Sequence, residues 1–162
     1  MLFKPTYCFN NASEISIDFL KSKRIKALIL DLDNTLTTHN NPIPREDIKN
    51  WLDTMKKNGV KMMIVSNNKP HRVQPFSDVL GLPFVPNGKK PLTFGFTQAI
   101  KELGENKKNV LIIGDQIFTD VLGANLKGCR CAFVYPMEYE TSFWFKVKRA
   151  IEKPLLPKKT YH

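Results

Sequence analysis

The chain has 162 residues, about the length of one domain, and its 42% hydrophobic and 25% charged residues are ordinary for a folded protein. These values exclude a mainly disordered or collagen-like chain, and three cysteines are too few for a disulfide framework, which favours a reducing compartment. The charge is unusual, because 25 Lys and Arg against 15 Asp and Glu give +10 and favour anionic partners such as nucleic acid, acidic lipid or a phosphorylated substrate.

Five short apolar runs divide the chain, and most of them are unbroken rather than alternating. They span residues 25–30, 60–65, 84–85, 110–113 and 131–135. Unbroken runs are typical of parallel strands that are covered on both faces. No run is long enough to span a membrane, and we expect no signal peptide, since residues 1–10 lack its basic and apolar segments.

Helical patterns separate these runs. The first face consists of Ile48, Trp51, Leu52 and Met55, with Pro44 in the first turn and an end at Asn58-Gly59. Further faces are formed by Leu92, Phe96, Ala99, Ile100 and Leu103, by Val121, Leu122 and Leu126, and more weakly by residues 73–80. The alternation predicts an α/β doubly wound, Rossmann-like parallel sheet in a single domain of residues 1–162. In such sheets functional side chains lie at the carboxyl ends of strands, where the strand order reverses.

The first run ends in two carboxylates, Asp31 and Asp33. Acidic groups just past a buried strand are costly without a partner, and a divalent cation is one candidate; the alternative is that Asp33 or Asn34 caps a turn. A calcium loop of the EF-hand type is excluded, because Thr35 and Leu36 stand where it needs an Asp or Asn ligand and a glycine.

Polar residues also follow the later runs. They are Ser66, Asn67 and Asn68 after the second, Lys89 and Lys90 before the helix that starts near Pro91, and Asp115 and Asp120 after the fourth. Hydroxyl, amide and lysine groups at these positions can bind phosphate oxygens, although each alone is common in turns and on surfaces. Asp120 can also begin the next helix.

Taken in order, these residues resemble the four motifs of the haloacid dehalogenase (HAD) superfamily. The motif sequences are similar to those of subfamily IIIA phosphatases, from Asp31-Leu32-Asp33-Asn34-Thr35-Leu36 to Gly114-Asp115-Gln116 with Thr119-Asp120. Within this subfamily they resemble the YqeG-like branch, which is related to mitochondrial phosphatidylglycerophosphate phosphatase. The resemblance covers residues 25–135 and implies a Mg²⁺-dependent phosphomonoesterase with a HAD-like fold.

The resemblance implies a role for each motif residue. Asp31 is the nucleophile that forms an aspartyl-phosphate, and Asp33 is the general acid and base. Mg²⁺ is held by the Asp31 carboxylate, the Asp33 backbone carbonyl and Asp115, while Asp120 orients the metal's waters from behind. Ser66 and Lys90 bind the phosphate and Asn67 assists. Lys89 is the alternative to Lys90 as the lysine that binds the phosphate.

Three further residues near the motifs carry a positive or titratable group. His39 is expected to be a solvated loop histidine rather than a substrate contact, and His71 or Arg72 could bind a second anionic group.

The spacing of the motifs leaves no room for a cap domain. The segments 35–44 and 66–90 are short, whereas an independent cap needs on the order of 50 residues. A capless, open site suits a phosphate on a large or surface-bound molecule. The resemblance to the YqeG-like branch implies a phosphatidylglycerophosphate headgroup as the substrate. We also expect a cytoplasmic protein, peripheral to the inner membrane face, with no stable nucleic-acid complex. The alternatives are a phosphatase of nucleic-acid ends or phosphoproteins, and a non-catalytic anion-binding module of the same fold.

The segment 139–162 is basic and amphipathic. Its six basic residues and two acids contribute +4 of the net +10, and Phe143, Trp144, Val147 and Ile151 share one helical face. Either this face covers the sheet as its last helix, or the segment contacts an anionic membrane. Both alternatives hold if the aliphatic face packs on the core while Phe145 and the lysines face lipid.

Overall fold

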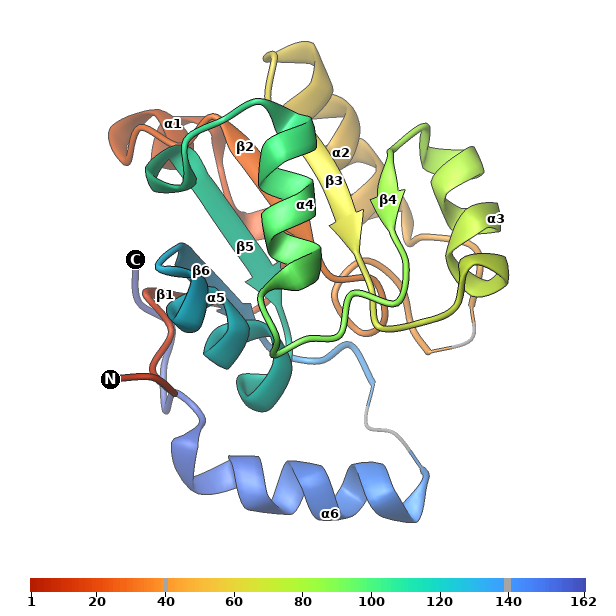
Figure 1. Cartoon of the computed structure of the whole chain (residues 1–162), viewed down its shortest axis with the longest axis vertical. Helices are drawn as coiled ribbons and strands as arrows, with labels where there is room; N and C mark the ends of the chain where they lie inside the picture. Colours follow the sequence, from red (N-terminus) through yellow and green to blue (C-terminus); the bar gives the residue numbers. More distant parts are fainter. Residues whose placement is uncertain (40, 139–140) are drawn as a thin grey trace.

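The computed structural model, which describes residues 1–39, 41–138 and 141–162, contains one six-stranded sheet. All strand pairs are parallel and the order is β1-β6-β5-β2-β3-β4 (Figure 1). The strands are β1 (Tyr7–Phe9), β2 (Ala27–Leu30), β3 (Lys61–Val65), β4 (Phe84–Val85), β5 (Val110–Gly114) and β6 (Arg130–Val134). The predicted parallel α/β sheet is thus confirmed, and each of the five apolar runs overlaps a strand.

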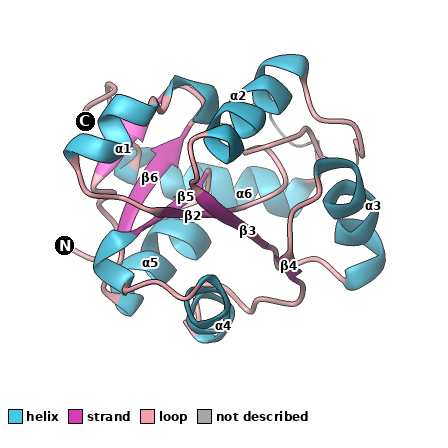
Figure 2. Ribbon diagram, turned by 90° about the horizontal axis from the view of Figure 1, so that it is seen from above, coloured by secondary structure: helices cyan, strands magenta, loops and turns pink. Residues whose placement is uncertain are grey.

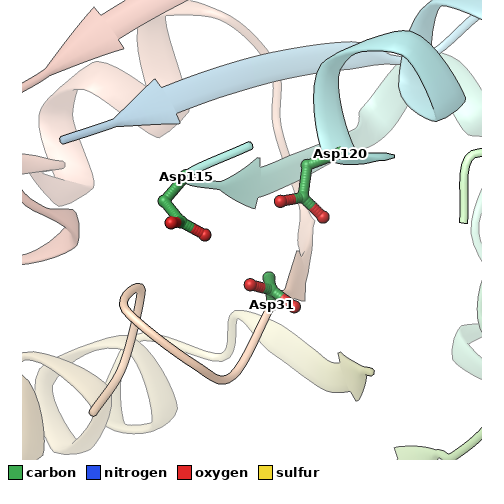
Figure 3. A group of neighbouring side chains, drawn as sticks. All are labelled: Asp31, Asp115 and Asp120. Atoms are coloured by element: carbon green, nitrogen blue, oxygen red, sulfur yellow. The ribbon is translucent and has the colours of Figure 1, made fainter. Parts of the chain in front are cut away.

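Strand order reverses beside β2. The chain passes from β2 to β3 and β4 on one side, and from β5 to β6 on the other, so Leu30 pairs with Ile64 and with Ile113. Such a reversal leaves a crevice at the carboxyl ends of the two central strands. Asp31 follows β2 and Asp115 follows β5, which brings their side chains together at this edge (Figure 3).

Helices cover both faces of the sheet (Figure 2). They are α1 (Ile17–Ser22), α2 (Glu46–Lys57), α3 (Pro70–Leu80), α4 (Phe94–Leu103) and α5 (Leu122–Lys127). Leu28 and Leu30 belong to the core under α1, α2 and α3, whereas Ala27 and Ile29 belong to the core under α4 and α5. Side chains of a strand alternate between faces, so an unbroken apolar run is what two covered faces require.

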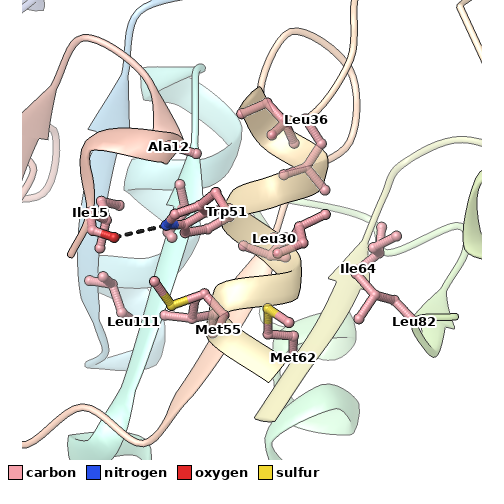
Figure 4. Packing of buried hydrophobic residues seen from close by; sticks show 14 of the residues in the cluster. Ala12, Ile15, Leu30, Leu36, Trp51, Met55, Met62, Ile64, Leu82 and Leu111 are labelled. Atoms are coloured by element: carbon pink, nitrogen blue, oxygen red, sulfur yellow. Dashed lines mark hydrogen bonds between the residues drawn. The ribbon is translucent and has the colours of Figure 1, made fainter. Parts of the chain in front are cut away.

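The face of α2 packs as its spacing predicts. Ile48, Trp51, Leu52 and Met55 are buried, and the Trp51 Nε1–H donates to the Ile15 carbonyl at 2.8 Å (Figure 4). This bond satisfies the indole N–H inside the core, where an unpaired donor would be costly. It also fixes α2 against the segment before α1.

Several sequence-based details were wrong. Pro44 precedes α2, whose first helical residue is Glu46 after the N-cap Arg45. Leu92 and Leu126 are 64% and 51% exposed instead of buried, because α4 begins only at Phe94 and α5 buries its small residues Gly123 and Ala124. The sequence reading also missed β1 and α1, which are too short to give a periodic signal.

A sixth helix, α6 (Phe143–Glu152), does not cover the sheet. Figure 1 shows it lying across the end of the molecule toward which the strand arrows point. Phe143, Trp144 and Ile151 are exposed, so the expectation that this apolar face packs on the sheet was wrong. Residues 139 and 140 of the predicted basic segment 139–162 lie outside the described residues.

Candidate active site

The loop after β2 presents two acids to the crevice and two leucines to the core. Leu32 and Leu36 are fully buried, while Asp31 and Asp33 are half-buried and line a pocket. The Asp31 N–H donates to the Ile113 carbonyl at 2.9 Å, which continues the pairing of β2 with β5 by one residue. The alternation of acid and leucine therefore anchors the loop and aims both carboxylates outward.

Asp31, Asp115 and Asp120 form an acidic cluster. One carboxylate oxygen from each lies within 4.8 Å of the others (Figure 3). Burial, together with the Asp31 charge, raises the pKa of Asp120 to about 6. Burial also raises the pKa of Asp115 well above its ordinary value, although the Arg149 guanidinium opposes this rise. The three carboxylates thus carry unfavourable charge that a cation can offset.

The glycine that ends β5 makes room for Asp120. A Cβ added at Gly114 would overlap the Asp120 carboxylate. Asp120 lies in a π-helical turn at Ile117–Val121, and its Oδ2 accepts from the Gln116 N–H at 3.2 Å. The close approach of Asp120 to Asp115 therefore requires glycine at position 114.

Lys90 is the cation inside the cluster. Its side chain is 3% exposed, and its Nζ lies 2.6 Å from Asp31 Oδ1 and 2.6 Å from Asp120 Oδ1. Burial lowers the pKa of Lys90, but the Asp120 and Asp31 carboxylates outweigh it and keep the pKa above its ordinary value, so the side chain is charged. Lys89 is exposed, so the geometry favours Lys90 over its rival.

Asn67 holds the backbone of Lys90. Its Oδ1 accepts from the Lys90 N–H at 2.8 Å, and its Nδ2 donates to the Lys90 carbonyl at 3.1 Å. Ser66 is buried beside it, where its Oγ accepts from the Asn68 N–H at 3.1 Å. The phosphate contacts of Ser66 and Asn67 stay predictions, and the Asn67 side chain already has a partner that positions Lys90.

Asp33 is held apart from the acidic cluster. Arg72 Nη2 donates to its Oδ1 at 2.6 Å, Asn68 Nδ2 donates to its Oδ2, and His39 Nδ1 lies 3.9 Å from Oδ1. The Arg72 guanidinium is therefore paired with an acid of the site, which weakens its predicted role as a second anion site. His71 is exposed and His39 lines the pocket.

A pocket of about 180 Å³ connects these groups, and it is lined by Asp31, Asp33, His39, Ser66, Asn67, Asn68, Lys90, Gln116, Thr119, Phe145 and Lys148. Five of the seven predicted site residues line this pocket. A sixth, Asp120, does not line it but pairs with Lys90, which does. Asp115, the seventh, lies behind in the acidic cluster.

The sequence reading missed the part of the site that α6 supplies. Phe145 lines the pocket with its ring centroid 5.8 Å from that of His39, and Lys148 Nζ donates to Gln116 Oε1. Arg149 pairs with the Asp115 carboxylate and donates to the Asp115 carbonyl at 2.8 Å. The expectation that Phe145 faces outward was wrong. Clustered cations on one turn were the available signal, but nothing in the sequence placed that turn beside β5.

The residues fit a divalent cation. Asp115 Oδ1 is buried and has no hydrogen-bond partner among the described residues, although Oδ2 is paired with Arg149. A buried carboxylate oxygen without a partner is costly, and oxygen atoms are the ligands that Mg²⁺ prefers. Asp31, Asp115 and Asp120 are the residues that could hold the ion; the Asp33 carbonyl as a ligand, and Asp120 acting through water, stay predictions.

Comparison with known proteins gives consistent matches. The model of haloacid dehalogenase-like hydrolases matches residues 39–126, and the model of mitochondrial PGP phosphatase matches residues 1–75. A Bacillus subtilis protein named probable phosphatase YqeG is 36% identical over 95% of this chain and 90% of its own length. The mitochondrial phosphatidylglycerophosphatase GEP4 of Saccharomyces cerevisiae is 27% identical over 78% of this chain and 75% of its own.

Solved structures share the fold at low identity. The 4-nitrophenylphosphatase of Thermotoga maritima has a TM-score of 0.61 and 11% identity, covering 74% of this chain and 89% of its own. The cobalt-bound deoxy-D-mannose-octulosonate 8-phosphate phosphatase of Haemophilus influenzae has a TM-score of 0.57 and 15% identity, covering 79% of this chain and 77% of its own.

Proposed function

Since the chain belongs to the haloacid dehalogenase-like hydrolases, as a phosphatase of the YqeG-like branch, we propose that it is a Mg²⁺-dependent phosphomonoesterase that acts through Asp31 on phosphatidylglycerophosphate. One observation carries the chemistry. The Asp31 carboxylate shares a cluster with Asp115, Asp120 and the charged Lys90, and it faces the same pocket as Asp33 and Ser66.

The first half of the reaction forms an acyl phosphate on Asp31. An Asp31 oxygen attacks phosphorus, and the bond from phosphorus to the substrate oxygen breaks. Asp33, in its protonated form, gives its proton to the leaving oxygen, so that an alcohol departs. A bound divalent cation offsets the repulsion between the carboxylate and the phosphate. For this step Asp33 must turn from Arg72 and Asn68 toward the leaving oxygen.

The second half releases phosphate. Asp33, now a carboxylate, takes a proton from water, whose oxygen attacks phosphorus and displaces the Asp31 carboxylate. Inorganic phosphate departs and both acids return to their starting forms. Lys90 neutralises charge on the non-bridging oxygens and the Ser66 hydroxyl donates to them, while Asn67 holds the backbone from which Lys90 reaches them.

The lipid substrate is supported by similarity to relatives. The model of mitochondrial PGP phosphatase matches the part of the chain that carries Asp31 and Asp33, and GEP4 is named for this activity. Among the described residues, the segment between Ser66 and Lys90 holds only α3 and β4, with no inserted cap, which suits a phosphate on a large or surface-bound molecule.

Two measurements test this proposal. The first compares hydrolysis of 4-nitrophenyl phosphate by wild-type protein and Asp31→Asn, with Mg²⁺ and with chelator. We expect activity only for wild-type protein with metal, because an amide is a poor nucleophile. Substantial turnover by Asp31→Asn would overturn the assignment of the nucleophile.

The second measurement compares phosphatidylglycerophosphate, presented in detergent micelles, with phosphorylated nucleic-acid ends, a phosphopeptide and soluble sugar phosphates. We expect the highest kcat/KM for the lipid. A higher value for a nucleic-acid end or phosphopeptide would replace the proposed substrate, and binding of all four without hydrolysis would indicate an anion-binding module.

A further inference from the structure

The helix α6 is amphipathic in the reverse sense of an ordinary surface helix. Its apolar side faces outward, where Phe143 is 71%, Trp144 77% and Ile151 58% exposed. Its polar side faces inward, where Glu152 is fully buried and Arg149 reaches Asp115. A surface helix normally buries its apolar stripe, so this arrangement leaves an apolar face in need of a partner. We call Phe143, Trp144, Val147 and Ile151 the outer face of α6.

Polar contacts fix this orientation. The Arg149 guanidinium donates to the Asp115 carbonyl at 2.8 Å, and Glu152 Oε1 accepts from the Phe118 N–H at 3.0 Å. Rotating α6 to bury its outer face would break both contacts and leave buried charges unpaired, which is strongly unfavourable. The outer face therefore stays available to something outside the chain.

Charge decides which partner fits. The chain carries +10, and Lys146, Lys153, Lys158 and Lys159 are exposed on or next to α6. A second copy placed on the outer face would bring these like charges together. An anionic lipid surface instead offers negative headgroups to the lysines and an apolar layer to the aromatic side chains, which is how interfacial helices bind.

A groove beside the outer face has the same mixed character. It measures about 450 Å³ and lies between α6 and the segment after β6, with Tyr135, Pro136, Ala150 and Leu156 in its lining and Lys146 and Lys153 among the remaining residues. Three of the seven lining residues, Lys146, Arg149 and Lys153, are cationic and the others are mostly apolar, which suits a lipid chain below its phosphate. No helix among the described residues is long and apolar enough to cross a bilayer.

We propose that the outer face of α6 docks on a bilayer rich in anionic phospholipid. The same helix lines the active-site pocket on its other side through Phe145 and Lys148. Docking therefore places the pocket beside lipid headgroups, and the use of this for catalysis rests on the proposed lipid substrate. The docking itself does not depend on the reaction.

Flotation of the full chain with vesicles tests the docking. We expect association with vesicles of equal parts phosphatidylglycerol and phosphatidylcholine, loss at high salt, and little association with phosphatidylcholine alone. Phe143→Ser with Trp144→Ser should lower association at least about tenfold, because each aromatic group loses its burial in lipid. The matched control is Leu126→Ser, which replaces an exposed apolar residue on α5 and should bind as wild-type protein does.

Fluorescence gives an independent readout, because the chain has two tryptophans and Trp51 is buried. Anionic vesicles should shift the emission of wild-type protein to shorter wavelength, and the Trp144→Phe variant should show no shift. Hydrolysis of 4-nitrophenyl phosphate by the Ser variants should equal that of wild-type protein, which shows that they fold.

Three results would overturn the docking proposal: no flotation of wild-type protein, equal flotation with neutral vesicles, or flotation of the double variant at the wild-type level. Dimers in lipid-free buffer that the double variant abolishes would assign the outer face to a second copy instead. Flotation without hydrolysis of phosphatidylglycerophosphate would contradict the proposed substrate and leave the docking proposal intact. Hydrolysis of this lipid in micelles without flotation would contradict the docking proposal and leave the proposed substrate intact.

Discussion

Replacing Asp120 with asparagine should stabilise the metal-free protein more as the pH rises. Burial and the Asp31 charge raise the pKa of Asp120 from its ordinary 3.8 to about 6. The folded state therefore keeps a proton that the unfolded chain releases between these two pH values. The free energy of unfolding must fall as pH rises through this interval, because the folded state binds more protons.

The size of the effect follows from the two pKa values. A rise from 3.8 to about 6 corresponds to about 3 kcal/mol of unfolding free energy lost above pH 6. Asp120 is 3% exposed, so solvent screens this penalty little. Asparagine does not titrate. The pKa of about 6 already includes the attraction to Lys90, and asparagine forms no ion pair at either pH, so the change with pH in the difference between variant and wild-type protein isolates the Asp120 carboxylate.

Urea unfolding in chelator at about pH 4.5 and about pH 7.5 measures this difference. We expect the Asp120→Asn variant to gain about 2 kcal/mol relative to wild-type protein between these two conditions, because about 1 of the roughly 3 kcal/mol is already lost at pH 4.5. Asp53→Asn, at an exposed position on α2, is the control and should show no such gain. Mg²⁺ should stabilise wild-type protein at the higher pH more than the variant. A difference that does not change with pH would refute the argument that the three carboxylates crowd one another.

Three further changes test individual parts of the site. Asp33→Asn should slow steady-state turnover by about 10²–10⁴-fold and leave a single burst of nitrophenol from 4-nitrophenyl phosphate, because the acid and base are lost while the nucleophile remains. Gly114→Ala should cost about 1–3 kcal/mol in urea unfolding and weaken metal binding, since the new methyl group overlaps the Asp120 carboxylate. Arg149→Gln should move the acid limb of the pH–rate profile to higher pH, because burial already raises the pKa of Asp115 and Arg149 opposes that rise.

Each of these changes has a result that contradicts its reasoning. Full activity of Asp33→Asn at every pH would remove its acid–base role. Gly104→Ala, at a left-handed position with open space, should cost stability without changing metal affinity, and equal effects at both glycines would mean that Gly114 acts only through the backbone. An unmoved acid limb in Arg149→Gln would show that the guanidinium does not influence Asp115.

The central site could be predicted because its residues follow strands that the sequence marks clearly. Asp31 and Asp115 each come directly after a buried apolar run, and parallel strands bring such ends together. Lys90 comes from farther along the chain; the motif order predicts it as part of the site, and the structure brings its ammonium group to Asp31 and Asp120. The structure adds why it fits: Asn67 holds its backbone while the carboxylates hold its ammonium group.

The sequence misled wherever burial depends on the rest of the fold. The face of Phe143, Trp144 and Ile151 has the spacing of a core helix, yet it is exposed, because Arg149 and Glu152 find partners that hold the opposite face inward. The predicted burial of Leu126 was wrong for a related reason, because α5 buries its small residues Gly123 and Ala124 instead. Periodicity shows which face of a helix is apolar, but it does not show which face the rest of the fold buries.

By itself the sequence determined the parallel sheet, the order of its central strands along the chain and the acids at their ends, because apolar runs and the residues that end them are local features. Only the tertiary structure decided that α6 closes one side of the pocket with Phe145 and Lys148 and that Arg149 neutralises Asp115. The Arg149 contact joins the residue after β5 to a helix residue that lies 34 positions later in the chain. Such pairing depends on the path of the chain in space, which spacing along the sequence does not encode.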